Sequence, residues 1–370
     1  MKILIVTKNY YPTFKGGGEI SVKLLADNLK KNGYHVEILS FDGKKEEEID
    51  GIKVTRKLLD NKSSFLKKVK IQNYLRIKAK DVDIIHFYGI FFANFGGLLS
   101  LLSKTKKIVT LNNYPPKIPT DLKNPLKIVW RKTRKKISLF FMKYVNSYIP
   151  LSSVVKNEYL QAGFSNNKFH LIPNMIPDDF FVKKIKDRRI KKKLKILYVG
   201  TIYRHKGVFI LLDSLKILLK EGKNIKLTIV GDGPEYNSLI EKIKDLNLLN
   251  NVDLTGFVNQ DEIKTYYDKA DLFIHPGIWK EPFGRTIIEA MARACPTIVS
   301  DIGAPPLILK NKKLVFEKDN PVALSKKIEE FISGKINLNN ISRELYRKSQ
   351  KYRVEKVFPE FIELYQSLVS

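Results

Sequence analysis

Short apolar runs alternate with longer amphipathic stretches along almost the whole chain. In the N-terminal half, the apolar runs predict strands at residues 2–7, 35–41, 83–87, 107–111, 147–151 and 169–172. In the C-terminal half, strands are expected at residues 195–199, 226–230, 252–255, 272–275, 297–300 and 314–315. Apolar residues recur at helical spacing between many of these runs, at residues 20–31, 208–221, 234–246, 261–268 and 285–294. This alternation predicts an α/β fold with two mostly parallel sheets, each covered by helices on both faces.

The chain has 370 residues, which is enough for two domains with separate cores. Residues 183–195 carry nine basic residues and one Asp without a core pattern, so we place the boundary in this segment. The N-terminal domain is then expected at residues 1–185 and the C-terminal domain at residues 194–350. The stretch from about residue 354 to residue 370 is amphipathic and predicts a final helix.

The net charge of +29 is concentrated in two stretches without acidic residues. Residues 62–80 carry seven Lys or Arg, and residues 122–143 carry eight. In the second stretch, Asn124 and Pro125 are typical of a helix start, as cap and first-turn residue. Apolar residues recur there at helical spacing: Leu126, Val129, Trp130, Ile137, Phe140, Phe141 and Tyr144. Such a helix either lies on an anionic membrane surface or packs its apolar stripe on the domain core while its basic face is solvated.

Other features of the composition exclude whole classes of protein. Cys295 is the single cysteine, so neither a disulfide framework nor a cysteine metal cluster is possible. No nucleic-acid-binding motif accompanies the positive charge. Residues 2–7 are too short an apolar run for a secretion signal, and no run approaches the ~20 residues of a membrane span. We therefore expect a cytoplasmic protein.

Two carboxylates flank the start of one predicted helix. Glu281 follows the strand at residues 272–275, and Glu289 lies within the helix at residues 285–294. The free N–H groups of the helix start and the positive end of its dipole lie between them. Carboxylates that accept from sugar hydroxyls beside a phosphate site suit a nucleotide-sugar. Alternatively, Glu281 is a solvated loop residue and Glu289 is a surface charge on its helix.

The surrounding residues resemble the retaining glycosyltransferases of family 4, which have the GT-B fold. The family pattern includes two Glu eight positions apart, followed by Glu-Ala-Met-Ala and then Ser-Asp-x-Gly. This chain matches it at Gly256, Phe257, Val258, Ala270, Asp271, Glu281, Glu289, Ala290, Met291, Ala292, Ser300, Asp301 and Gly303. Further matches are Ile172, Pro173, Asn174, Val199, Gly200, Lys206, Gly207 and the run Val230, Gly231, Asp232, Gly233, Pro234. The resemblance implies two Rossmann-like doubly wound domains facing across a cleft, with the helix at 354–370 crossing back onto the first.

The resemblance also implies roles for residues of the C-terminal domain. Glu281 would contact hydroxyls of the donor sugar, and Glu289 would bind the ribose hydroxyls. The backbone around Phe283, Gly284 and Arg285 would contact the sugar or the diphosphate, and Val258 would contact the base. Lys206 matches the lysine that neutralises the diphosphate. The arginine usual after Gly200 is Thr201 here, and Arg204 is a candidate to replace it.

On the N-terminal side the match is weaker. Gly16, Gly17 and Gly18 form a glycine loop before the first helix, and the resemblance places Gly17 and Gly18 near the donor phosphates or the acceptor. This loop is too far from its strand for a dinucleotide fingerprint, so a hydride-transfer enzyme is a weak alternative.

A family histidine near the reacting carbon is replaced by Asn112, which cannot transfer a proton. His86, at a predicted strand end, is either a site residue or a structural one. Ala304 and Leu307 stand where the family usually has Gly and Glu.

These features predict a retaining, metal-independent hexosyltransferase that moves a sugar from a nucleotide-sugar to a hydroxyl of a growing, lipid-linked, cell-surface glycan. We expect it on the inner face of the cell membrane, bound through residues 62–80 and 122–143, without a cofactor and without nucleic acid. Two alternatives remain. The first is a soluble transferase acting on a small molecule or glucan, and the second is a catalytically weak subunit that binds nucleotide or carbohydrate.

Overall fold

The computed structural model describes the chain except residues 14–15, 59–64, 91–92, 117–124 and 191. It contains two compact units, which are described separately. Unit 1 comprises Met1–Met175 and Lys356–Ser370, and unit 2 comprises Ile176–Glu355. The division falls earlier than the basic segment in which the sequence analysis placed it, because residues after Met175 pack on unit 2.

Unit 1 is built on a seven-stranded sheet with the order β3-β4-β2-β1-β5-β6-β7. Its strands are β1 (Lys2–Thr7), β2 (His35–Ser40), β3 (Lys45–Ile49), β4 (Ile52–Arg56), β5 (Ile84–Tyr88), β6 (Lys106–Leu111) and β7 (Ser147–Pro150). All neighbours are parallel except β3 and β4. The polar edge strand β3 and its partner β4 were not predicted. The strand predicted at residues 169–172 is wrong, because only an isolated bridge joins Phe169 to Tyr148.

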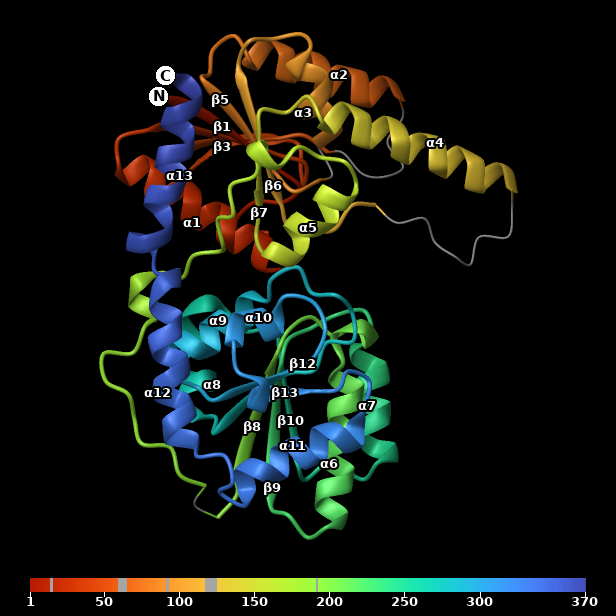
Figure 1. The fold of residues 1–370 in the computed structure, drawn as a ribbon, viewed down its shortest axis with the longest axis vertical. Helices are drawn as coiled ribbons and strands as arrows, with labels where there is room; N and C mark the ends of the chain where they lie inside the picture. Colours follow the sequence, from red (N-terminus) through yellow and green to blue (C-terminus); the bar gives the residue numbers. More distant parts are fainter. Residues whose placement is uncertain (14–15, 59–64, 91–92, 117–124, 191) are drawn as a thin grey trace. The chain divides into compact units, whose positions relative to one another are not determined.

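Helices cover both faces of this sheet (Figure 1). They are α1 (Gly17–Lys31), α2 (Phe65–Lys78), α3 (Ala93–Ser100), α4 (Pro125–Met142), α5 (Ser153–Gln161) and α13 (Val354–Val369). Helices α2, α3 and α4 lie on one side of the sheet, and α1 and α13 lie on the other. The buried strands supply most of one continuous core, including Leu4, Val6, Phe87, Val109 and Tyr148. The predicted cap Asn124 lies outside the described residues.

Unit 2 is built on a six-stranded, fully parallel sheet with the order β10-β9-β8-β11-β12-β13. Its strands are β8 (Leu194–Val199), β9 (Ile225–Val230), β10 (Val252–Gly256), β11 (Leu272–His275), β12 (Thr297–Ser300) and β13 (Val315–Phe316). Its helices are α6 (Val208–Lys220), α7 (Tyr236–Asp245), α8 (Gln260–Lys269), α9 (Arg285–Ala292), α10 (Pro305–Leu309), α11 (Pro321–Ile332) and α12 (Leu338–Ser349). Helices α6, α7 and α11 lie on one side of the sheet, and α8, α9 and α12 lie on the other (Figure 1).

The basic segment that was expected to link two domains is anchored to unit 2 by Arg188. This side chain is buried, and its guanidinium donates to backbone carbonyls at the ends of α8 and α9. The oxygens include those of Ala294, at 2.8 Å, and Arg293, at 3.1 Å. Carbonyls at a helix end have no partner within the helix, so Arg188 supplies the donors that they lack.

Candidate active site

The loops that follow β8 and β11 bring Lys206 and Glu281 together in unit 2. These strands are neighbours in the sheet, so their carboxyl ends lie side by side, where open parallel sheets bind ligands. The Lys206 Nζ lies 2.6 Å from Glu281 Oε2. The two side chains are only 23% and 14% exposed, which excludes the interpretation of Glu281 as a solvated loop residue.

Two further side chains surround the Glu281 carboxylate. Trp279 donates from its indole Nε1 to Glu281 Oε2 at 2.8 Å, and its ring lies beneath the Lys206 ammonium at 4.9 Å. The His275 Nε2 lies 4.0 Å from the same oxygen. Burial raises the pKa of Glu281, but the charge of Lys206 and the hydrogen bonds from Lys206 and Trp279, together with the nearby His275, lower it by more, so the net pKa is lowered. Burial lowers the pKa of His275 to about 4, so Glu281 is ionised and His275 is neutral at pH 7.

Two glycines hold the backbones of these loops close together. Gly207 has a φ of 78°, and a Cβ built there would lie 1.8 Å from the carbonyl oxygen of Pro276. Gly303 has a φ of 77°, and its Cβ would lie 2.5 Å from the Glu281 nitrogen. The Ala304 N–H also donates to the Glu281 carbonyl, at 2.9 Å. Both positions therefore require glycine, and the second one fixes the backbone that carries Glu281.

Glu289 lies inside α9 and is buried, so it is not a surface charge on its helix. Its Oε1 accepts from Arg285 Nε at 3.0 Å, and its Oε2 accepts from the Tyr267 hydroxyl at 3.1 Å. Burial raises the pKa of Glu289, against the opposing charge of Arg285. Before the helix, Phe283 is buried edge-on against Tyr352. Gly284 precedes the first helical residue with a φ of 99°.

The other predicted donor-site residues of unit 2 are more dispersed. The Arg204 side chain is 69% exposed, pairs with Glu235 at 3.2 Å and lies over the Phe209 ring, 4.7 Å from its centroid. Thr201 uses its backbone carbonyl to accept from the Tyr198 hydroxyl, at 3.1 Å. Val258 is half-buried directly after β10. The structure thus joins Lys206 to Glu281 and turns Arg204 toward another partner.

In unit 1 the structure favours the structural interpretation of His86. The ring is fully buried at the centre of β5. Its Nδ1 lies 2.7 Å from the Tyr365 hydroxyl of α13, and its Nε2 lies 2.7 Å from the Thr110 hydroxyl of β6. Burial lowers the His86 pKa to about 3, so the ring is neutral. With both nitrogens bonded, His86 connects α13 to the sheet.

Asn112 and the glycine loop lie at the carboxyl ends of unit 1 strands. Asn112 is half-buried after β6, and a Cβ on Gly89 would lie 3.3 Å from its amide atoms. Gly17 and Gly18 are the first residues of α1, and a Cβ built on Gly18 would meet no heavy atom of the described residues outside the local chain within 4 Å. Among these residues, which leave out positions 14 and 15, the space at Gly18 is wide enough for close approach of a ligand.

Three residues around the carboxylates were missed by the sequence analysis. Trp279 and His275 could have been found, because both lie between the end of β11 and Glu281. Nothing in the sequence pointed to Tyr267, because this residue lies in α8 and comes next to Glu289 of α9 only in the folded structure.

Helix α4 carries an exposed apolar stripe. Val129, Trp130, Ile137 and Phe140 are 61%, 59%, 51% and 53% exposed. At about 100° per residue these four positions fall within an arc of about 100° on the helix. A different side of the helix faces the core, because Met142 is buried. Of the other predicted stripe residues that are described, Phe141 is half-buried and Tyr144 is exposed, so most of the described stripe is exposed while Leu139 and Met142 meet the core. Within the part of the chain that the structure describes, no helix is long and apolar enough to cross a bilayer.

Two family models match the chain in succession. Residues 15–180 match "Glycosyltransferase Family 4", and residues 180–350 match "Glycosyl transferases group 1". An uncharacterized glycosyltransferase of Methanocaldococcus jannaschii is 27% identical, over 99% of this chain and 98% of its own. An amylovoran biosynthesis glycosyltransferase of Erwinia amylovora is 30% identical, over 44% of this chain and 41% of its own. HepE of Anabaena, solved in complex with UDP, has a TM-score of 0.79 at 18% identity, covering 99% of this chain and 100% of its own.

Proposed function

The chain belongs to the glycosyltransferases that these two family models describe and has the GT-B fold, and we propose that it transfers a sugar with retention from a nucleotide-sugar to a hydroxyl of a growing glycan. The Lys206–Glu281 pair is the observation that carries this proposal. It joins one cation and one carboxylate at the carboxyl ends of neighbouring parallel strands. A sugar diphosphate needs both groups, a cation for the phosphates and an acceptor for the hydroxyls.

The proposed step breaks the bond between the anomeric carbon and the diphosphate oxygen. The nucleoside diphosphate departs with the electron pair, and Lys206 stabilises the negative charge that develops on it. The acceptor hydroxyl attacks from the face that the diphosphate leaves, and its proton passes to the departing phosphate. Glu281 accepts from hydroxyls of the donor sugar and acts as a binding residue, because a neighbouring lysine already holds its carboxylate.

Glu289 is the proposed ribose ligand, and it must bind the ribose hydroxyls in addition to the hydrogen bonds that it already accepts. Both carboxylate oxygens already accept a hydrogen bond, one from Arg285 and one from Tyr267. Each carboxylate oxygen has two lone pairs, so ribose hydroxyls can add to these bonds without replacing them. We propose that Phe283, Gly284 and Arg285 contact the sugar or diphosphate through their backbone and that Val258 contacts the base.

We further propose that transfer needs no metal. The charge of the diphosphate would be met by Lys206 and by the N-terminal end of α9, which carries no acidic residue in its first turn. Arg204 would join them only after breaking its ion pair with Glu235. This costs little free energy because the Arg204 side chain is 69% exposed.

The acceptor is proposed to be lipid-linked and reached at an anionic membrane surface. Support comes from α4, where Trp130 and Phe140 are exposed on one side and Arg131, Lys132 and Lys136 are exposed on others. Helices of this kind lie in the headgroup region with their apolar residues inserted. Residues 62–64 and 122–124 of the two basic stretches lie outside the described residues. A cytoplasmic location, peripheral on the inner face of the membrane, follows from this proposal.

A thermal-shift panel of UDP, GDP, ADP and dTDP with their common sugars, with and without EDTA, tests the donor. A ligand at about one hundred times its Kd adds ~2.7 kcal/mol of stability, so a true donor raises Tm clearly. A shift with one base that EDTA leaves unchanged supports the proposal. Stabilisation by none of them would point instead to the catalytically weak subunit.

Liposome sedimentation tests the membrane. Replacing Arg131, Lys132, Arg134, Lys135 and Lys136 with Gln should release the protein from anionic vesicles. Equal sedimentation of this variant and its parent would favour the soluble transferase.

A further inference from the structure

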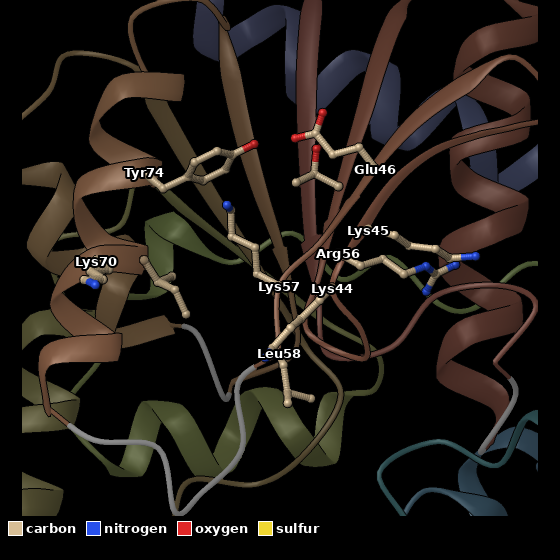
Figure 2. Close-up of a pocket in the computed structure, with 10 residues that line it drawn as sticks. Lys44, Lys45, Glu46, Arg56, Lys57, Leu58, Lys70 and Tyr74 are labelled. Carbon is tan, nitrogen blue, oxygen red and sulfur yellow. The ribbon is translucent and has the colours of Figure 1, made fainter.

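A hollow lies at the edge of unit 1, between the β3–β4 hairpin and α2 (Figure 2). It has a volume of about 430 Å³, which is within the usual range for small-ligand pockets. Five of the lining residues are basic and one is acidic. Ile71, Leu58 and Tyr74 supply apolar surface between them. Lys70, Ile71 and Tyr74 belong to the basic stretch at residues 62–80, but no predicted donor-site residue lines this pocket.

Two of the five basic residues already form ion pairs with acidic residues. Arg56 is buried, with its Nη1 2.7 Å from Asp42 and its Nε 2.5 Å from Glu47. Lys45 Nζ lies 2.5 Å from the other oxygen of Glu47. In Figure 2 both side chains point away from Tyr74. The positive charges of Arg56 and Lys45 are therefore balanced by Asp42 and Glu47.

Lys44, Lys57 and Lys70 are not compensated in this way. None of the three ammonium groups forms an ion pair or a hydrogen bond within the described residues. The lining acid Glu46 lies 4.0 Å from Lys53, outside the pocket. Lys57 extends toward Tyr74, with its Nζ 4.2 Å from the ring centroid (Figure 2). Three like charges around one concave surface repel one another and focus a positive potential into it.

The base of this pocket is fixed by Arg56. The Arg56 Nη2 donates to the Tyr11 carbonyl at 2.6 Å, and its Nη1 lies 3.3 Å from the Tyr10 carbonyl. A Cβ on Gly43 would lie 3.2 Å from Arg56 Cδ, so the turn that carries Lys44 packs closely on it. Lys57 directly follows this anchored residue. The backbones that carry Lys44 and Lys57 are therefore held in place before any ligand arrives.

We propose that this pocket binds a phosphate group. A carboxylate brings a single charge, whereas a phosphate monoester carries about −1.5 to −2 at pH 7 and offers three acceptor oxygens. Lysines act as separate point charges and can approach such a group from several sides. The proposal depends on the proposed function only for the molecule that carries the phosphate, which is either a phosphate-bearing acceptor or an anionic phospholipid headgroup.

Lysine acetylation with mass-spectrometric readout tests the pocket residue by residue in the intact protein. The probe is inorganic pyrophosphate. At about ten times its Kd, some nine-tenths of the sites are filled, so acetylation of Lys57 and Lys70 should slow about tenfold. Acetylation of Lys44, in the turn before β3, should slow in the same direction. The exposed lysines Lys31 and Lys104 of the same unit are the matched controls and should not change.

Lipid vesicles identify the molecule that carries the phosphate group. Phosphatidylcholine vesicles with added phosphatidylglycerol should protect the same three lysines if the phosphate belongs to a lipid, and should add nothing to pyrophosphate if it belongs to a soluble molecule. Either result agrees with a phosphate pocket. Protection by these vesicles but not by pyrophosphate would overturn the proposal, because the lysines would then only face a charged surface. Pyrophosphate protection no greater than that of Lys31 and Lys104 would overturn it as well.

The same digests separate this proposal from the proposed function. Lys206 reports on the donor site, and the stabilising nucleoside diphosphate should protect it. Protection of Lys206 without protection of Lys57 and Lys70 refutes the pocket alone. Protection of Lys57 and Lys70 without protection of Lys206 refutes the donor site alone. Replacing Lys44, Lys57 and Lys70 together with Gln should abolish the pyrophosphate binding that calorimetry detects with the donor site saturated, whereas replacing Lys2, Lys31 and Lys104 should not.

Discussion

Replacing Lys206 with Met should destabilise unit 2 and slow transfer strongly, for two separate reasons. The change leaves the Glu281 carboxylate, 14% exposed, without its cation at 2.6 Å. At an effective dielectric of about 20 the lost Coulomb attraction is about 6 kcal/mol, and burial of both charges offsets most of it. Removing one partner of a fully buried pair costs about 3–5 kcal/mol. Because this pair is partly exposed and Trp279 keeps its bond to the carboxylate, we expect about 2 kcal/mol.

The pH dependence of this loss follows from the pKa of Glu281. In the wild-type protein the pKa of Glu281 is lowered. The ionised carboxylate therefore contributes fully to the free energy of unfolding above its ordinary pKa of 4.5, and this contribution is lost as the pH falls through the lowered pKa. Without Lys206, burial dominates and the pKa rises. The variant then loses stability as the pH rises through the raised pKa. The difference in Tm should therefore be larger at pH 8 than at pH 5, and about 4–8 °C at its largest.

A second variant separates stability from catalysis. Replacing Glu281 with Gln in the Lys206→Met protein removes the negative charge that Lys206 had balanced and should restore most of the Tm. Transfer should remain about 10²–10³-fold slower, because the developing phosphate charge still lacks its cation. Thermal unfolding and the release of nucleoside diphosphate from the donor measure the two effects. A Tm difference that is independent of pH, or recovery of turnover in the double variant, would refute this reasoning.

Three other changes probe the frame around the sites. Gly303→Ala forces a Cβ to within 2.5 Å of the Glu281 nitrogen, so we expect a loss of about 1–3 kcal/mol in thermal unfolding and weaker donor binding by calorimetry. Arg188→Gln leaves buried carbonyls without donors and should lower the urea midpoint by an amount equivalent to about 2–3 kcal/mol, with wild-type donor affinity. Tyr365→Phe removes a bond to His86 and should cost about 1 kcal/mol without slowing transfer; slower transfer at unchanged stability would revive a catalytic role for that histidine.

Most of the parallel strands were predictable because apolar residues dominate their sequences, although β4, which is parallel to β2, was not predicted. The four consecutive apolar residues of β1, Ile3–Val6, and the apolar or aromatic residues at four of the five positions of β5 leave few alternatives once helical stretches separate such runs. The edge strand β3 has the opposite character. Its sequence from Lys45 to Ile49 contains three consecutive glutamates, and the strand forms because it pairs with β4 across a tight turn. Pairing of this kind depends on the partner strand and leaves no periodic signal in the sequence.

The candidate site also has one part that could be predicted from the sequence and one part that could not. Lys206 and Glu281 could be proposed because each lies in the loop after a predicted strand, and carboxyl ends of neighbouring parallel strands meet. That the two residues form one ion pair could not be predicted, since the neighbourhood of β8 and β11 is a property of the strand order. Arg204 shows the limit most clearly. It lies in the same loop as Lys206, but its side chain pairs with Glu235, the N-cap residue of α7.

The buried bonds of Glu289 bear on how the donor site would select its nucleotide. Arg285 lies one turn before Glu289 in α9, and Tyr267 reaches it from α8. A carboxylate held by two donors is fixed in position, and a ribose that adds its hydroxyls meets an acceptor that is already oriented, so little conformational entropy is lost on binding. The same bonds make the carboxylate a weaker acceptor for each new partner. Donor affinity should then depend on Tyr267 and Arg285 as well as on Glu289, although neither needs to contact the nucleotide through its side chain.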